Sequence, residues 1–130
     1  MDKIYSVTTL PMEKIGILTR VSSKVQESDG TSLDVQKNLG LKVSKNLGFK
    51  PIIFNEGSQS SFNVEINERL QLVELLEEIQ KKSGGIRKVW VFNTDRLGRY
   101  SKSWYTILKV FLDYSVELYV GESSKPYDFN

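Results

Sequence analysis

Residues 15–19, Ile-Gly-Ile-Leu-Thr, form a short and largely apolar run that predicts a buried β-strand. A helix is expected next, because Thr31 and Asp34 have the spacing of a capping box and Gly48 is a helix stop. The apolar residues of this helix fall on roughly one face: Leu33, Leu39, Val43 and Leu47. Gly40 interrupts it, at a cost of about 1 kcal/mol relative to Ala.

The alternation of strand and helix continues to residue 120. Further strands are expected at residues 50–54, 88–92 and 116–120. Asn67 is expected to cap a second helix, which ends at Gly84-Gly85 and has an apolar stripe of Leu70, Val73, Leu76 and Ile79. A third helix is expected to begin at Ser101 or Ser103. Its apolar stripe consists of Trp104, either Ile107 or Leu108, and Phe111. This order predicts an α/β fold: a mostly parallel sheet of four or five strands with helices on both faces.

Length and composition limit the architecture and the chemistry. A chain of 130 residues predicts one domain, which we place at residues 15–121, between an N-terminal arm at 1–14 and a polar tail at 122–130. Cys is absent, which excludes disulfides and favours an intracellular protein. His is also absent, so catalysis has to use Ser, Asp, Glu, Arg, Lys or Tyr. No apolar run is long enough to cross a membrane.

Charge is unevenly distributed along the chain. Between Lys81 and Lys102 there are seven basic residues and one acid, Asp95, whereas between Glu65 and Glu78 five Glu accompany one Arg. Two solvated faces of opposite sign would explain these runs equally well. The basic run becomes informative only when it is combined with the predicted topology.

Ligands of parallel α/β sheets bind at the carboxyl ends of the strands. Three polar clusters follow the first three predicted strands: Arg20-Val21-Ser22-Ser23, Glu56-Gly57-Ser58 and Asp95-Arg96-Leu97-Gly98-Arg99. Arginines gathered at one edge repel each other unless an anion lies among them, and the forked guanidinium suits phosphate. The pattern therefore favours a serine nucleophile that faces a phosphate. Ordinary ion pairs of Arg20 with Glu56 or Asp95 are the alternative.

The clusters, taken in order, resemble the motifs of the serine site-specific recombinases, the family of resolvases, invertases, integrases and transposases. The resemblance runs from Ile15 to about Gly121 and also includes two segments, Arg20 to Gln26 and Ser32 to Gln36. Five residues separate Gln26 from Ser32, which is more similar to the large integrase-type members. The expected fold is thus the resolvase-like catalytic domain.

The resemblance implies a mechanism and a set of site residues. Ser22 would attack a DNA phosphodiester, form a 5′-phosphoserine bond and release a 3′-hydroxyl, and strand exchange and rejoining would need neither metal nor ATP. Arg20, Arg96 and Arg99 would surround the phosphate, and Asp95 would orient an arginine or assist proton transfer. The supporting positions are Gln36, Ser58 and Gln26.

The sequence departs from the family at Leu18, where Tyr is common, at Gln59, where Gly is common, and at Tyr100, where a small polar residue is frequent. The resemblance also implies that a dimerisation helix and a DNA-binding region would follow Asn130. The full-length protein would then form dimers and synaptic tetramers on DNA, and the isolated domain a monomer or weak oligomer. A cytoplasmic protein of bacterial, archaeal, phage or mobile-element origin is expected.

Two other functions fit parts of the sequence. The domain could be a non-catalytic assembly or regulatory module with the same fold. A receiver-type phosphate-binding domain needs acidic residues after the first strand, and Arg20-Val21-Ser22 has the wrong charge for it.

Overall fold

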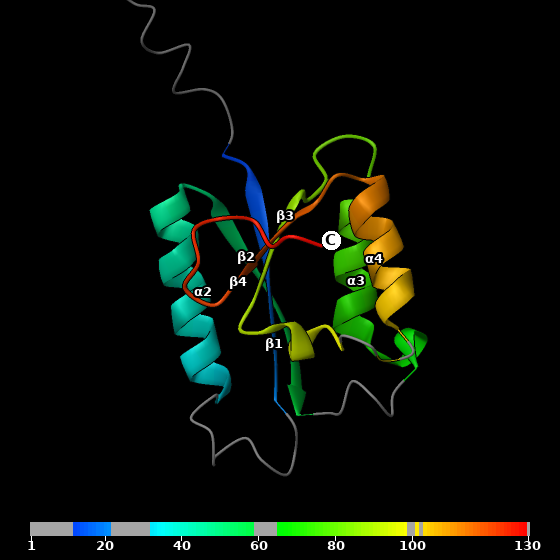
Figure 1. Cartoon of the computed structure of the whole chain (residues 1–130), viewed down its shortest axis with the longest axis horizontal. Helices are drawn as coiled ribbons and strands as arrows, with labels where there is room; N and C mark the ends of the chain where they lie inside the picture. Colours follow the sequence, from blue (N-terminus) through cyan, green and yellow to red (C-terminus); the bar gives the residue numbers. More distant parts are fainter. Residues whose placement is uncertain (1–11, 22–31, 59–64, 99–100, 102, 130) are drawn as a thin grey trace, which may run out of the picture.

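A parallel sheet forms the centre of the molecule (Figure 1). The structure is a computed structural model that describes residues 12–21, 32–58, 65–98, 101 and 103–129. Its strands are β1 (Lys14–Val21), β2 (Lys50–Ser58), β3 (Lys88–Val91) and β4 (Glu117–Val120). They pair in the order β2-β1-β3-β4, and each pairing is parallel. The predicted parallel sheet is therefore confirmed, and of the two predicted sizes, four or five strands, the described residues form four.

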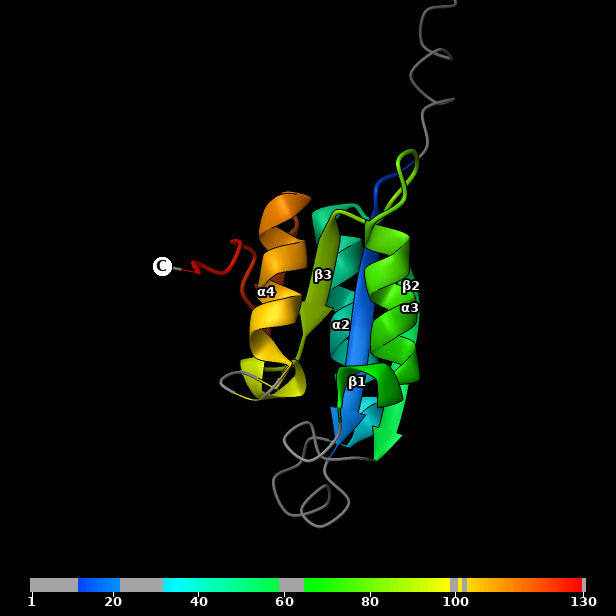
Figure 2. The same ribbon diagram turned by 90° about the vertical axis from the view of Figure 1, so that its right-hand side faces the viewer.

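Helices cover both faces of this sheet, as predicted (Figures 1 and 2). One face carries α2 (Leu33–Leu47), and the other carries α3 (Leu70–Ile79) and α4 (Trp104–Asp113). Two short 3-10 turns, η1 (Ile66–Glu68) and η2 (Thr94–Arg96), precede α3 and follow β3. The order of the strands reverses between β1 and β3, which is where ligands bind in such sheets.

Each face of the sheet has its own apolar core, because side chains alternate along β1. Ile15 and Ile17 point to the α2 side, where they pack with Val43, Trp90 and Tyr119. Leu18 points to the other side. The core on that side combines strand residues with the buried faces of two helices: Phe54, Val89, Leu118, Leu72, Leu75, Leu76, Ile79, Trp104, Ile107 and Phe111. The predicted apolar stripe of α4 is buried: Trp104, Ile107 and Phe111 all lie in the core. Of the two alternatives, Ile107 and Leu108, Ile107 is therefore the stripe residue.

Gly40 lets α2 approach the sheet closely. A Cβ atom at this position would lie 2.7 Å from Ile17 Cγ2 and 2.8 Å from Trp90 Cε3, far inside van der Waals contact. Both neighbours are fully buried, so neither can move aside at low cost. The helix-propensity cost of this glycine is thus offset by the packing that it permits.

We expect Gly40→Ala to lower the free energy of unfolding by about 1–2 kcal/mol, although Ala favours a helix, because overpacking a rigid core costs more than propensity returns. Urea denaturation would measure the change. The control is Asn38→Ala on the exposed side of α2, which should be neutral or slightly stabilising. A stabilised Gly40→Ala protein would contradict the close packing.

The predicted helix starts are wrong in detail. The N-cap of α2 is Ser32, whose hydroxyl accepts from the Val35 N–H at 3.2 Å, and not Thr31, which lies outside the described residues. Asn67 does not cap α3 but lies inside η1, where Glu65 and Glu68 form a capping box. Local hydroxyls and carboxylates compete for the same N–H groups, and spacing alone does not show which of them wins.

The helix α3 also differs from its predicted extent and stripe. It begins after Arg69, and its buried residues are Leu72, Leu75, Leu76 and Ile79. Leu70, expected on the stripe, is 74% exposed. The helix ends at Ile79, before Gly84-Gly85, because the returning chain satisfies its last carbonyls. Arg87 Nη1 donates to the Ile79 carbonyl at 2.5 Å.

Ser103 is the N-cap residue of α4, as one alternative predicted, but its hydroxyl makes no capping hydrogen bond. The Ser101 and Ser103 hydroxyls are both buried, and within the described part of the chain neither has a hydrogen-bond partner.

Two strands are longer than predicted, and this changes where the polar clusters lie. β1 continues through Arg20 to Val21, and β2 continues through Glu56 to Ser58, a polar cluster that was expected to follow the strand and not to belong to it. The register between these strands shifts after Thr19, where Gly57 has a φ of 74°. The Asn55 side chain accepts the Gly57 N–H at 2.9 Å. Such a bulge bends the strand and redirects side chains at the end of a sheet.

The segment after Gly121, predicted to be a polar tail, turns back onto the domain (Figure 1). The Tyr127 N–H donates to the Leu118 carbonyl at 2.6 Å, along the free edge of β4. The Tyr127 and Phe129 rings lie 5.5 Å apart, and Phe129 lies 6.4 Å from Phe111 of α4. Two aromatic side chains therefore extend the α4-side core beyond the last strand.

Candidate active site

Arg20 lies at the carboxyl end of β1 and is 3% exposed. Its guanidinium donates to two main-chain carbonyls of η2: Nη2 to that of Asp95, and Nε to that of Arg96 at 3.2 Å. These contacts join the ends of β1 and β3 at the point where the strand order reverses. The structure thus brings together two of the polar clusters that the sequence placed at this edge.

Gln36, in the first turns of α2, holds the main chain of Arg20 from the other side. The Arg20 N–H donates to Gln36 Oε1 at 3.1 Å, and Gln36 Nε2 donates to the Arg20 carbonyl at 2.9 Å. Gln36 is fully buried, so this paired contact is shielded from water. The family resemblance implies a supporting role for Gln36. Its contacts in the structure hold the main chain of Arg20 in place.

Arg96, the last residue of η2, is 8% exposed, and its guanidinium carbon lies 5.7 Å from the centre of the Phe92 ring. Asp95, in contrast, is exposed. The turn that carries both residues is shaped by Asn93, whose side chain accepts the Asp95 N–H at 3.1 Å. The main-chain carbonyls of this turn, and not the Asp95 side chain, accept the described hydrogen bonds from Arg20.

Arg69 is the site residue that the sequence analysis missed. It is fully buried before α3, and it forms a forked ion pair with Glu56: Nε to Oε1 at 2.7 Å and Nη2 to Oε2 at 2.5 Å. Arg69 also donates to the carbonyls of Arg96 at 2.9 Å and Leu97 at 3.1 Å. In the sequence it was the single Arg of an acidic run, with no signal that it would be buried.

The electrostatics of this cluster favour an anion. Three arginines, Arg20, Arg69 and Arg96, are buried together, and they are accompanied by Glu56 and by the exposed Asp95. Burial, and then the charge of Arg69, lower the pKa of Arg20 to about 10 from the ordinary 12.5, against the opposing effect of Glu56. An anion such as phosphate stabilises the charged form of a buried guanidinium, so the binding of an anion beside these arginines is favourable.

The remaining predicted residues are not joined to this cluster by any contact that we describe. Ser58 is exposed at the end of β2, opposite Val21 of β1, so it lies at the same edge of the sheet. Ser22, Gln26 and Arg99 lie outside the described residues. Ser22 nevertheless follows Val21, the last residue of β1, directly in the chain.

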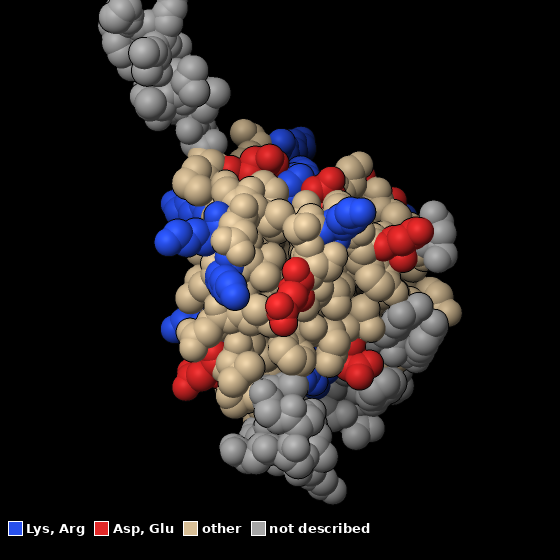
Figure 3. Space-filling view, turned by 60° about the vertical axis from the view of Figure 1, so that its left-hand side comes forward, with Lys and Arg blue, Asp and Glu red and all other residues tan. Residues whose placement is uncertain are grey.

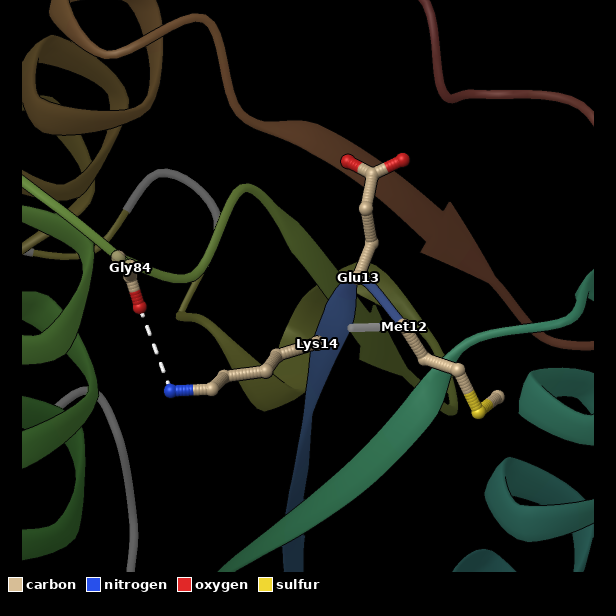
Figure 4. A pocket seen from close by; sticks show the side chains of 5 residues that line it. Met12, Glu13, Lys14 and Gly84 are labelled. Carbon is tan, nitrogen blue, oxygen red and sulfur yellow. Dashed lines mark hydrogen bonds between the residues drawn. The ribbon is translucent and has the colours of Figure 1, made fainter. Parts of the chain in front are cut away.

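A cavity of about 370 Å³ lies at the opposite end of the sheet, away from the arginines (Figure 4). It is lined by Met12, Glu13, Lys14, Gly84 and Gly85, and Lys14 Nζ donates to the Gly84 carbonyl at 3.3 Å. Its place at the amino ends of β1 and β3 separates it from the arginine cluster. Among the described residues there is no group of three or more acidic side chains placed to hold a metal ion. None of the described helices is long and apolar enough to span a bilayer.

The fold and the site together define a parallel α/β domain with a buried arginine cluster at the switch point of the sheet. A family profile described as "Resolvase, N terminal domain" matches residues 15–130. The chain belongs to this family, the serine recombinases, as their catalytic domain.

Solved structures agree with the family. The N-terminal catalytic domain of TP901-1 integrase is 25% identical, with a TM-score of 0.65 over 82% of this chain and 76% of that one. A resolvase family site-specific recombinase from Streptococcus pneumoniae is 24% identical, with a TM-score of 0.66 over 91% and 78% of the two chains, and shows the same fold. No curated protein matches the chain.

We expect Glu56→Gln to lower the free energy of unfolding by about 3 kcal/mol, because it leaves the buried Arg69 guanidinium without its counter-charge. Chemical denaturation would measure the loss. Glu77→Gln, on the exposed side of α3, removes the same charge and should change stability by less than about 0.5 kcal/mol. Equal effects of the two changes would show that the buried pair does not support the fold.

Proposed function

We propose that the domain cleaves and rejoins DNA, with Ser22 as the nucleophile. The observation that carries this proposal is the buried pair of Arg20 and Arg96 at the edge where β1 leads into Ser22. A phosphodiester placed there meets preorganised cationic groups, and Ser22 is the residue that follows Val21 in the chain. Membership of the serine recombinases supports the same chemistry.

The reaction consists of two transesterifications. The Ser22 hydroxyl oxygen attacks the phosphorus, a 5′-phosphoserine bond forms, and the bond to the 3′ oxygen breaks, so that a 3′-hydroxyl leaves with a proton. The 3′-hydroxyl of the exchanged strand then attacks the phosphoserine and releases Ser22. Each step replaces one phosphate ester with another, so the energy of the ester bond is retained without ATP.

The site residues divide these tasks among themselves. Arg20 and Arg96, with Arg99, stabilise the additional negative charge of the pentacoordinate transition state. Asp95 orients an arginine or assists proton transfer. Gln36 fixes the main chain of Arg20. Ser58 and Gln26 support the bound strand.

The proposal extends to the partners and to the type of enzyme. The substrate is DNA, and dimers with synaptic tetramers form in the full-length protein. The similarity to the TP901-1 integrase domain supports the integrase type that the spacer before Ser32 indicated.

We expect the full-length gene product to form a covalent adduct with a nicked suicide DNA substrate, and Ser22→Ala to abolish it. Denaturing gel electrophoresis of end-labelled DNA would detect the adduct at the 5′ phosphate. Ser23→Ala, the neighbouring hydroxyl, is the matched control and should keep the adduct. An adduct that survives Ser22→Ala would refute the assignment of the nucleophile.

We expect Arg20→Lys to make cleavage sensitive to alkaline pH. The burial and the Arg69 charge that lower the pKa of Arg20 would also lower the pKa of a lysine at this position below its ordinary value. A lysine is charged below its pKa, so the ratio of variant to wild-type cleavage rates should fall as the pH rises from 7 to 9.

The control for this pH profile is Arg87→Lys. Arg87 binds carbonyls at the end of α3, at the other end of the sheet, so its rate ratio should stay flat. A flat ratio for Arg20→Lys as well would show that the charge at position 20 does not act in cleavage.

A further inference from the structure

Three exposed lysines lie on the part of α2 that faces away from the sheet. Lys37, Lys42 and Lys45 are all exposed, while the helix buries Gln36, Gly40, Val43 and Ser44 against the sheet. We call these three lysines the α2 lysine face. From Val35 to Asn55 the sequence contains no Asp or Glu. In Figure 3, where this side of the molecule comes forward, basic side chains gather along one margin of the view.

The lysines of this face have no carboxylate partner among the described residues. Two exposed lysines on other helices or their flanks have such partners: Lys81 lies 2.9 Å from Glu78, and Lys109 lies 2.9 Å from Asp113. A solvated helix that needs only charge balance carries acids three or four residues from its lysines, as α4 does; α2 has one, Asp34, three residues before Lys37, and none at such a spacing from Lys42 or Lys45. The helix dipole explains Lys45, which is in the last turn, but it does not explain Lys37 or Lys42.

The face begins beside the active site. Lys37 follows Gln36, whose side chain is bound to the main chain of Arg20, so the first turns of α2 are fixed to the carboxyl edge of the sheet. From Lys37 to Lys45 the helix rises about 12 Å. Each strand of duplex DNA carries one phosphate per about 3.4 Å of axis, so several phosphates fit along this length.

We propose that the α2 lysine face binds the phosphate backbone of the DNA that flanks the cleaved bond. The proposal rests on the proposed function for the choice of DNA as partner. The contacts are electrostatic and independent of base sequence, because lysine ammonium groups reach phosphates and not base edges. The face thereby holds the duplex while the arginine cluster engages one phosphate.

The test is the salt dependence of binding to a short duplex, measured by fluorescence anisotropy with the full chain. Each phosphate neutralised by a lysine steepens the dependence of log K on log salt by about 0.9. The triple variant Lys37→Gln/Lys42→Gln/Lys45→Gln should therefore lose most of three such contributions. Between about 50 and 200 mM salt, wild-type affinity should fall roughly forty-fold more than that of the variant.

The matched control removes the same charge elsewhere. Lys81→Gln/Lys82→Gln/Lys109→Gln should leave the slope close to that of the wild type, and thermal unfolding should show that both triple variants fold. Equal slopes for the two triple variants would overturn the proposal, because net charge would then explain the binding. Binding of poly-glutamate that depends on the face, together with DNA binding that does not, would also overturn it in favour of an acidic protein partner.

Failure of this proposal is distinguishable from failure of the proposed function. Ser22→Ala should retain the wild-type salt slope. If the wild-type chain forms no covalent adduct but the α2 triple variant has a shallower salt slope, the proposed cleavage chemistry is refuted and DNA binding by the α2 lysine face is supported. If the wild-type chain forms the adduct but the α2 triple variant keeps the wild-type salt slope, the proposed cleavage chemistry is supported and DNA binding by the α2 lysine face is refuted.

Discussion

The carbonyl oxygen of Arg96 accepts from two buried guanidinium groups, Nε of Arg20 at 3.2 Å and Nη2 of Arg69 at 2.9 Å. One donor comes from the end of β1 and the other from the start of α3. The turn after β3 is therefore held from two sides by charged donors, which make stronger hydrogen bonds than neutral ones. Glu56 in turn fixes Arg69 through both of its oxygens. Strand ends that are separate in the sequence become one rigid unit through these contacts.

The same contacts hold three positively charged guanidinium groups close together at the site. Burying three guanidinium groups together is unfavourable, because burial and the charge of Arg69 disfavour the charged form of Arg20 and lower its pKa. The fold tolerates the cost because main-chain carbonyls and Glu56 accept hydrogen bonds from Arg20 and Arg69. Under the proposed function, a phosphate at this edge would meet side chains that are already oriented, so the reaction would need little reorganisation.

The fold and part of the site could be predicted from the sequence. Buried apolar runs separated by helical stripes determine a parallel sheet, and the topology then brings Arg20, Asp95 and Arg96 to one edge. Arg69 could not be found in this way, because its importance depends on burial against Glu56, 13 positions earlier in the chain. Helix starts were misplaced for a related reason. Which of several neighbouring hydroxyls or carboxylates binds an N–H group is decided by local geometry, and composition does not record it.

The two edge strands of the sheet are protected in different ways against pairing with a strand of another chain. At β2, Pro51 lacks an N–H group and Lys50 carries a charge, so the outer margin offers a poor template for another strand. At β4, the Tyr127 N–H occupies the Leu118 carbonyl, and the aromatic residues beyond it cover that side. Because both edges are poor templates for another strand, copies of the domain can stay separate at high local concentration and do not pair into a continuous intermolecular sheet.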